Sequence, residues 1–252
     1  MSKFFVKSEK INNDTILIDT DDVNHIKNVL RKEIGDTIIV CDYEKKINYN
    51  CRIEEIGKKE IICKIESQKE SESESNVRID IFQGLPKADK MELIIQKGTE
   101  LGVNSFIPVE FKRSIVKIDP KDEDKKISRW QKIAEVAAKQ SGRDIIPVIK
   151  RIENAKNICK LFENYDIVLV AYEAENKNGL KEALRSLDNS KKEVKIAVVI
   201  GPEGGIEEQE VEEFKQAGAK IVTLGKRILR TETVCLAMAA IINYELEKTE
   251  EE

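Results

Sequence analysis

The sequence Ile-Gly-Pro-Glu-Gly-Gly at residues 200–205, followed by Leu-Gly-Lys-Arg-Ile-Leu-Arg-Thr-Glu-Thr at residues 224–233, decides the fold class of this chain. Each stretch lies at the carboxyl end of a predicted strand. Glycines at that position allow backbone amides to approach a small ligand without a Cβ in the way. Two such loops close together in the sequence predict one ligand pocket.

The residues around these loops alternate between predicted strands and helices, which is typical of a mostly parallel sheet with helices on its faces. The expected strands are 77–84, 105–109, 166–172, 195–200 and 220–224, and the expected helices are 91–101, 127–140, 206–216 and 233–248. The last helix is apolar around nearly its whole circumference. We therefore expect it to be buried on all sides, either within the core or between two subunits.

The first part of the chain has a different pattern. Short β-rich stretches at 37–40, 49–53 and 60–65 indicate a small barrel or sandwich, interrupted by one short helix that carries Val23, Ile26 and Leu30 on one face. Residues 68–76 have no apolar side chain and predict an exposed linker. We therefore predict two domains, 1–70 and 71–252.

Composition excludes several classes of protein. No apolar stretch is long enough to cross a bilayer and the N-terminus lacks the pattern of a secretory signal, so we expect a cytoplasmic protein. The five cysteines form no C-x-x-C pair, which argues against a disulfide framework or a zinc site. A single histidine, His25, excludes multi-histidine metal sites. We predict no metal, and chemistry that depends on charged side chains or a cofactor.

The charge is unevenly distributed along the chain. The formal net charge is -4, yet residues 71–160 carry more basic than acidic side chains, whereas both ends are acidic. This pattern permits a local nucleic-acid face on an acidic protein, although such a surplus is also common on ordinary solvated surfaces.

The glycine loops match neither common nucleotide motif. They lack both the G-x-x-x-x-G-K-[ST] of a P-loop and the G-x-G-x-x-G of a dinucleotide site. A plain tight turn at 201–205 and helix capping by Thr231 or Thr233 are the structural alternatives. Capping does not explain Arg227 and Arg230, because positive charge at a helix N-terminus opposes the helix dipole. These arginines indicate an anion, or negative charge that develops during a reaction.

Both loops together closely resemble the ribosomal RNA small-subunit methyltransferase E family, a member of the SPOUT superfamily of trefoil-knotted methyltransferases. Further matches are Lys-x-x-Glu-Leu-Gly-Val at 97–103, Arg-Ser at 113–114, Gln-Ser-Gly-Arg at 140–143, and His-x-x-x-Val-Leu-Arg at 25–31. Two departures are Val234, where alanine is usual, and Ile206-Glu207, where an aromatic residue and a serine are common. The second departure removes an expected helix cap.

The resemblance implies an α/β fold in which a small N-terminal PUA-like β-barrel domain for RNA precedes a SPOUT catalytic domain with a parallel sheet and a C-terminal trefoil knot. It implies a homodimer that uses S-adenosylmethionine (SAM) to methylate N3 of a uridine in small-subunit (16S) rRNA, either naked or assembled in the subunit. Such a transfer needs no metal, since the electrophile carries its own leaving group. No membrane partner is expected.

The chemistry of this transfer and the basic middle of the chain suggest roles for individual residues. Arg230, and Arg143 from the same or a partner subunit, are expected to stabilise charge on the base, with Glu232 as a candidate proton acceptor. The expected cofactor-binding residues are Ala171, Tyr172, Glu173, Ile200, Gly201, Pro202, Glu203, Gly204, Gly205, Leu224, Gly225, Ile228, Leu229 and Thr233. The expected RNA contacts are Arg31, Lys87, Lys90, Lys97, Lys112 and Arg113.

Three alternatives stay open at this point. A knotted methyltransferase could act on another RNA position, and a non-catalytic RNA-binding or ribosome assembly factor could retain the same fold. A dinucleotide oxidoreductase is disfavoured by the missing fingerprint.

Overall fold

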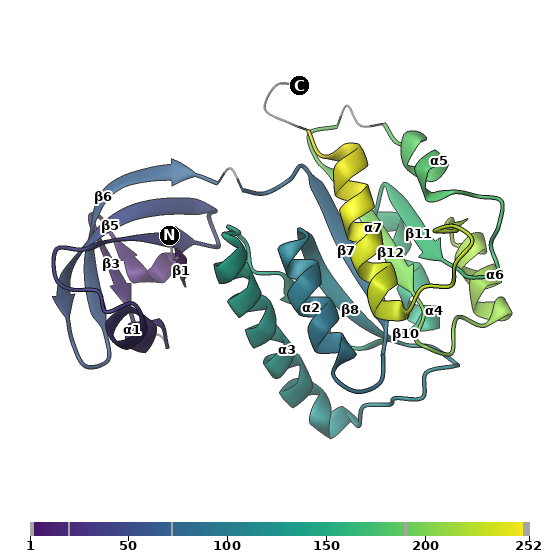
Figure 1. Cartoon of the computed structure of the whole chain (residues 1–252), viewed down its shortest axis with the longest axis horizontal. Coiled ribbons are helices and arrows are strands. Elements are labelled where there is room, and N and C mark those ends of the chain that lie inside the picture. Colours follow the sequence, from purple (N-terminus) through teal and green to yellow (C-terminus); the bar gives the residue numbers. More distant parts are fainter. Residues whose placement is uncertain (1–2, 20, 72, 189–190, 249–252) are drawn as a thin grey trace. The chain divides into compact units, whose positions relative to one another are not determined.

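The computed structural model describes residues 3–19, 21–71, 73–188 and 191–248 (Figure 1). It divides into two compact units, Met1–Glu74 with Ala138–Ile146, and Ser75–Ala137 with Pro147–Glu252. The division falls four residues after the boundary predicted at 70/71. The sequence does not indicate that residues 138–146 belong to the first unit, because their placement depends on contacts between residues far apart in the sequence.

The first unit is built on one six-stranded sheet in the order β1-β4-β5-β6-β3-β2. Its strands are β1 (Lys3–Val6), β2 (Ile11–Asn12), β3 (Thr15–Ile18), β4 (Thr37–Asp42), β5 (Ile47–Ile56) and β6 (Ile61–Glu70). Strand β1 pairs with β4 in parallel, and the other pairs are antiparallel. In β5 the side chains of Tyr49, Cys51 and Ile53 are buried while the residues between them are exposed, as the period-2 pattern predicts.

Three short helical segments complete this unit: η1 (Ser8–Lys10), α1 (Asp22–Asn24) and η2 (His25–Val29). The predicted apolar face is confirmed, because Val23 and Ile26 are buried in the core of the sheet and Leu30 packs against it.

The exposed linker predicted at residues 68–76 is partly wrong. Strand β6 continues to Glu70, which pairs with Ile47, because a strand is held by backbone hydrogen bonds and needs no apolar side chains there. Residue 72 of the predicted linker lies outside the described residues.

A buried charged cluster ties residues 142–145 into the first unit. The Asp144 carboxylate pairs with the Lys3 ammonium and accepts hydrogen bonds from Ser71 Oγ at 2.6 Å and Ser73 Oγ at 2.7 Å. Burial opposes the ionised form of Asp144, but these hydrogen bonds outweigh burial and lower its pKa. Ser71, Ser73 and Asp144 lie near two of the three places where the chain passes between the units, and side chains of one unit thus join these places.

The second unit contains a parallel sheet in the order β10-β8-β7-β12-β11-β13, with β9 paired to β8. The strands are β7 (Val77–Gly84), β8 (Val103–Glu110), β9 (Val148–Ile149), β10 (Glu153–Asn154), β11 (Ile167–Ala171), β12 (Val194–Ile200) and β13 (Lys220–Val222). The predicted strand bounds agree with these to within two residues at most ends, and those of β7 agree at both. Runs of apolar residues indicated these strands because a parallel sheet is covered on both faces.

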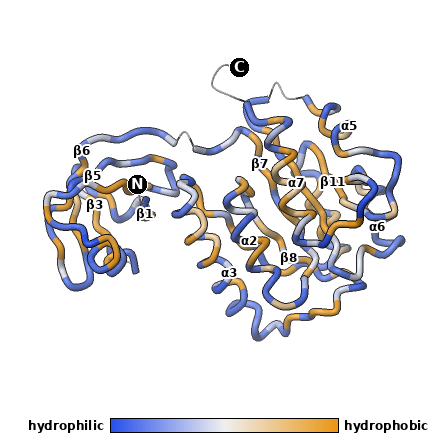
Figure 2. Tube along the Cα trace, viewed as in Figure 1, coloured by the Kyte–Doolittle hydropathy of each residue, from blue (hydrophilic) through white to orange (hydrophobic). Residues whose placement is uncertain are grey.

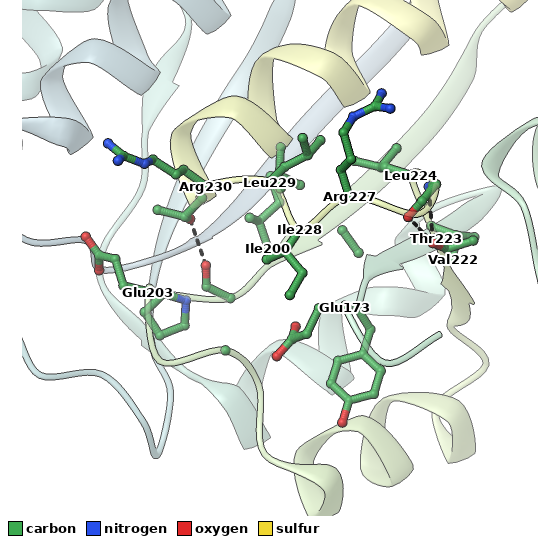
Figure 3. Close-up of a pocket in the computed structure, with 18 of the residues that line it drawn as sticks. Glu173, Ile200, Glu203, Val222, Thr223, Leu224, Arg227, Ile228, Leu229 and Arg230 are labelled. Carbon is green, nitrogen blue, oxygen red and sulfur yellow. Dashed lines mark hydrogen bonds between the residues drawn. The ribbon is translucent and has the colours of Figure 1, made fainter. Parts of the chain in front are cut away.

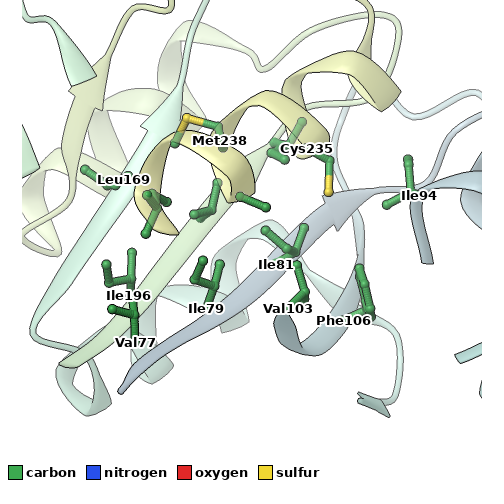
Figure 4. Close-up of a cluster of buried hydrophobic side chains, with 14 of the residues drawn as sticks. Val77, Ile79, Ile81, Ile94, Val103, Phe106, Leu169, Ile196, Cys235 and Met238 are labelled. Carbon is green, nitrogen blue, oxygen red and sulfur yellow. The ribbon is translucent and has the colours of Figure 1, made fainter. Parts of the chain in front are cut away.

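Helices cover both faces of this sheet. They are α2 (Lys90–Glu100), α3 (Pro120–Ser141), α4 (Ala155–Ile158), η3 (Cys159–Asn164), α5 (Leu180–Arg185), α6 (Glu208–Gln216) and α7 (Thr231–Leu246). Helices α2, α3, α5 and α7 pack on one face, and α4, η3 and α6 pack on the other. Figure 4 shows Cys235 and Met238 of α7 facing Ile79 of β7 and Ile196 of β12. The predicted alternation of strands and helices is confirmed.

Helix α7 is buried on one side only within this chain. Cys235, Met238 and Ile242 are buried, whereas Ile241 is 38% exposed and Tyr244 is 87% exposed. Of the two predicted alternatives, complete burial within the core of the chain is therefore wrong, because the sheet can bury only the face that rests on it. Figure 2 shows α7 as one of the most hydrophobic segments of the unit. Its burial between two subunits stays a prediction, as does the C-terminal knot.

Other sequence-based expectations concern cysteines and membranes. All five cysteines are free; four are buried and Cys159 is half-buried. Among the described residues, no helix combines the length and apolar character needed to cross a membrane.

Candidate functional site

The carboxyl ends of β11, β12 and β13 meet at a pocket of about 470 Å³ in the second unit (Figure 3). Three loops form it, each directly after one of these neighbouring strands. This edge of an open parallel sheet is where ligands bind in many α/β proteins. The prediction that the loops at 200–205 and 224–233 share one pocket is confirmed by this geometry.

Nearly all the predicted cofactor-binding residues line the pocket, and only Thr233 does not. Arg230 also lines it. The sequence analysis did not assign several further lining residues to this pocket, namely Lys90, Val222, Thr223, Lys226, Arg227, Thr231 and Val234. Most of these lie beside predicted residues in the same loops, but Lys90 comes from the start of α2 and only the fold brings it here.

The turn at 201–205 leaves no room for a side chain at its glycines, and Gly205 is the tightest of them. Gly205 has φ +74, and a Cβ on it would lie 2.5 Å from Glu173 Oε1. The left-handed conformation and this close approach both favour glycine. Figure 3 shows the Glu173 carboxylate pointing toward Ile228 across the pocket. The Glu173 carboxylate, from the loop after β11, therefore lies beside the turn at 201–205.

Gly84, at the end of β7, packs so closely against the same turn that we expect its replacement to destabilise the protein. A Cβ on Gly84 would lie 2.4 Å from Pro202 N, so the backbone of the turn must move if alanine is introduced. We expect Gly84→Ala to destabilise the protein by about 1–3 kcal/mol and to weaken ligand binding in the pocket. Gly179→Ala is the matched control, because nothing lies within 4 Å of its Cβ position. Equal melting temperatures for both variants would contradict this expectation.

Thr231 connects three elements around the pocket. Its hydroxyl donates to Gly201 O at 2.7 Å and accepts from Gln83 Nε2 at 2.8 Å. It thus joins the end of β7, the turn after β12 and the first residue of α7. The alternative that Thr231 or Thr233 caps the helix is wrong, since Arg230 occupies the N-cap position and no side chain bonds there.

The start of α6 also differs from expectation. Glu207 and Glu210 form a reciprocal capping box, so the helix has a cap despite the absence of the usual serine. Glu210 is buried and additionally accepts the Lys112 N–H at 2.9 Å, which fastens the loop after β8 to α6.

Two arginines stand at the start of α7. Arg227 and Arg230 are exposed, and within the described residues neither pairs with a carboxylate. Figure 3 shows their guanidinium groups pointing to different sides of the pocket, with Arg230 on the same side as Glu203. Both charges are thus available to an anion or to a base that becomes negative.

Lys90 lies between two carboxylates of the site. Its ammonium is 3.1 Å from Glu203 Oε1 and 3.3 Å from Glu232 Oε2. The hydrogen bond to Glu203 is the largest effect on Lys90 and raises its pKa against partial burial. Burial of Glu203 opposes its ionised form, but hydrogen bonds from backbone N–H groups and from Lys90 outweigh that and lower its pKa. Lys90 and Glu203 thus hold each other in their charged forms.

The six predicted RNA contacts fall into two groups. Lys90, Lys97 and Lys112 each pair with a carboxylate of the chain; the partners of the last two are Glu100 and Glu207. Lys87, Arg31 and Arg113 are exposed without such a partner in the described residues, and Arg113 makes one long hydrogen bond to Gly204 O. RNA contact by all six stays a prediction.

Arg143 does not line the pocket. It belongs to the first unit, is 5% exposed and pairs with Glu74 Oε2 at 2.7 Å. Glu74 also accepts the Asp144 N–H at 2.9 Å, so this arginine is part of the cluster that holds residues 142–145. Its contribution to catalysis stays a prediction, whereas its structural role is directly visible.

Among the described residues, no group of three or more histidine, cysteine or acidic side chains could hold a metal ion.

Comparison with known proteins identifies the family. A model of the RNA methyltransferase domain matches residues 73–243, and one of the RNA methyltransferase PUA domain matches residues 18–66. The chain is 37% identical to ribosomal RNA small subunit methyltransferase E of Bacillus subtilis over 98% of each chain. The chain belongs to this family. The predicted architecture, a PUA domain followed by an α/β methyltransferase domain, is thus confirmed.

Solved structures of the family agree with this fold. The methyltransferase E of Neisseria gonorrhoeae, bound to SAM, is 29% identical and superposes with a TM-score of 0.84 over 98% of each chain. A methyltransferase structure from Legionella pneumophila, also in complex with SAM, is 26% identical and has a TM-score of 0.85 over 98% of each chain.

Proposed function

We propose that this protein transfers a methyl group from SAM to N3 of a specific uridine in 16S rRNA. Membership of the methyltransferase E family supports rRNA methylation, and two solved relatives bind SAM. The observation that carries the proposal is the single pocket formed by the loops after β11, β12 and β13, with Arg230 at its edge.

The pocket residues fit a molecule such as SAM. A volume of about 470 Å³ lies within the usual range of small-molecule sites, about 300–1,000 Å³. Ile228 is 85% exposed and would be covered by an apolar part of the ligand. The Glu173 carboxylate, which points into the pocket, complements a cation (Figure 3). When bound, SAM supplies an electrophilic methyl group on a positively charged sulfur.

The chain's own residues then orient the base and manage its charge. Uracil N3 carries a proton that must leave before or during attack, so negative charge develops on the base oxygens. Arg230 lies at the pocket edge without a carboxylate partner in the described residues, and we assign to it the stabilisation of that charge. The contacts of Glu232 do not favour its predicted role as proton acceptor, because its Oε2 lies 3.3 Å from the Lys90 ammonium.

RNA recognition is assigned to the PUA domain together with the exposed Lys87 and Arg113 near the pocket. Unpaired cations can contact phosphates, whereas lysines already paired with carboxylates gain less from doing so. We also propose a homodimer, because Ile241 and Tyr244 leave an apolar stripe uncovered along α7.

Methyl transfer can be tested directly. The purified protein is incubated with SAM labelled in its methyl group and with small ribosomal subunits from cells that lack this activity, and the RNA is digested to nucleosides. We expect label in N3-methyluridine. Label in another nucleoside would favour a methyltransferase for a different RNA position, and no label with intact RNA binding would favour an assembly factor.

Ligand-dependent melting separates the enzyme from the non-catalytic alternative. A ligand that binds only the folded state at 100 times its Kd stabilises by about 2.7 kcal/mol. We therefore expect SAM at that concentration to raise the melting temperature by several degrees, and NAD to leave it unchanged. An unchanged melting temperature with SAM at any concentration would argue for a binding protein that retains only the fold.

A further inference from the structure

Lys90 is the only residue of α2 that lines the candidate pocket in the described part of the chain. It is the first residue of α2, and its ammonium lies 3.1 Å from Glu203 in the turn after β12 and 3.3 Å from Glu232 in the first turn of α7. The side chains of Lys90, Glu203 and Glu232 are 27%, 28% and 15% exposed. One cation thus connects three segments that are far apart in the sequence.

The position of Lys90 is unfavourable unless these carboxylates hold it. A positive charge in the first turn of a helix opposes the helix dipole. Two carboxylates within 3.3 Å offset that effect, and the Lys87 N–H donates to Glu203 Oε1 at 3.1 Å in the same segment. The segment from Lys87 to Lys90 therefore holds Glu203 from two directions.

The same contact bears on Arg230. Glu232 follows Arg230 by two residues in the first turn of α7, so the orientation of that turn determines where the guanidinium lies. Lys90, Glu203 and Arg230 line the pocket, whereas Glu232 does not line it and contacts Lys90 beside it. The Lys90 ammonium carries its proton and lies within ion-pair distance of both carboxylates, Glu203 and Glu232.

We propose that Lys90 is a positioning residue, which fastens the turn at Glu203 to the start of α7, and that Glu232 serves this ion pair instead of accepting the N3 proton. The inference rests on the proposed methyl transfer. It also replaces the expectation that Lys90 contacts RNA phosphates, since its charge is already engaged.

The first test compares Lys90→Met with Lys90→Arg. Methionine keeps an unbranched side chain but removes the charge, so we expect a higher Kd for SAM by calorimetry and a kcat about 10²-fold lower through misplacement of Arg230. Arginine should restore most of both, because it can still bridge two carboxylates. Lys215→Met is the matched control: it breaks a pair with Glu212 on α6 and lies outside the pocket. Circular dichroism establishes that each variant is folded.

A Lys90→Met variant that binds SAM and turns over like the wild type would overturn the positioning role. Equal losses of SAM binding and kcat in Lys90→Met and Lys90→Arg would also overturn it, since the ion pairs with Glu203 and Glu232 would then not matter. A failure to fold in Lys90→Met alone, rescued by arginine, would support the bridge. If the wild type neither binds SAM nor transfers methyl groups, the proposed function itself fails, and this inference fails with it.

The second test addresses the proton. Glu232→Gln keeps an oxygen that can accept from Lys90 but cannot take a proton as a carboxylate does. We expect kcat to fall less than about tenfold and the pH dependence of kcat to keep its shape, whereas loss of a general base lowers the rate by about 10²–10⁴-fold. A loss of that larger size, with the limb of the pH profile that reports the base removed, would show that Glu232 accepts the proton.

Discussion

Arg230→Ala is expected to lower kcat by about 10²–10³-fold, the usual effect of removing one group that stabilises developing negative charge. Arg230 stands at the N-cap of α7, lines the pocket and has no carboxylate partner within the described residues, so its charge is free to act on the base. The Kd for SAM should change little. Single-turnover methylation of small ribosomal subunits measures the rate, and calorimetry measures the Kd.

Two further variants sharpen this expectation. Arg230→Lys keeps the charge but loses the planar guanidinium, so we expect partial activity. Arg227→Ala removes the same type of side chain from the same loop, and Figure 3 shows that side chain pointing to another side of the pocket. A larger loss of kcat in Arg227→Ala than in Arg230→Ala would show that Arg227, and not Arg230, stabilises the negative charge on the base.

The second large effect concerns stability of the first unit. Asp144→Ala removes the carboxylate that pairs with the Lys3 ammonium and that accepts hydrogen bonds from two serine hydroxyls. Removal of one partner from a buried ion pair typically destabilises by about 3–5 kcal/mol. We expect a loss of that order in urea unfolding followed by circular dichroism. Glu66→Ala is the control, because its pair with Arg52 in the same unit is exposed and such pairs contribute about 0–1 kcal/mol.

The pH dependence of stability should report the same carboxylate. The pKa of Asp144 is lowered in the folded protein, so its contribution is complete above the unfolded pKa of about 3.9 and is lost as the pH falls through the folded value. Wild type and Asp144→Asn should therefore differ most in free energy of unfolding near neutral pH and converge in strong acid. A difference that grows as the pH falls would contradict this sign.

The sequence analysis located the pocket because its chemistry is local. Glycines, prolines and charged residues directly follow apolar strands at 200–205 and 224–233, and parallel strands place their carboxyl ends at one edge. The bounds of β7 followed from the same reasoning, since a run of apolar residues ends there at a glycine.

The parts that the sequence analysis missed depend on distant partners. Lys90 resembles any other exposed lysine until the fold brings Glu203 and Glu232 to it. Arg143 lies in a motif that suggested catalysis, but its burial and its pair with Glu74 arise only from tertiary structure. Helix α7 looked uniformly apolar, and nothing in its own sequence tells which face the sheet covers.

A crystal structure of the protein grown with SAM tests the central claim most directly. We expect the donor between the turn at 201–205 and the loop at 224–229, with Ile228 covered, the Glu173 carboxylate facing positive charge on the ligand, and the methyl group directed toward the side where Arg230 stands. SAM bound anywhere else in the molecule, or both turns closed against it by their own side chains, would contradict that claim.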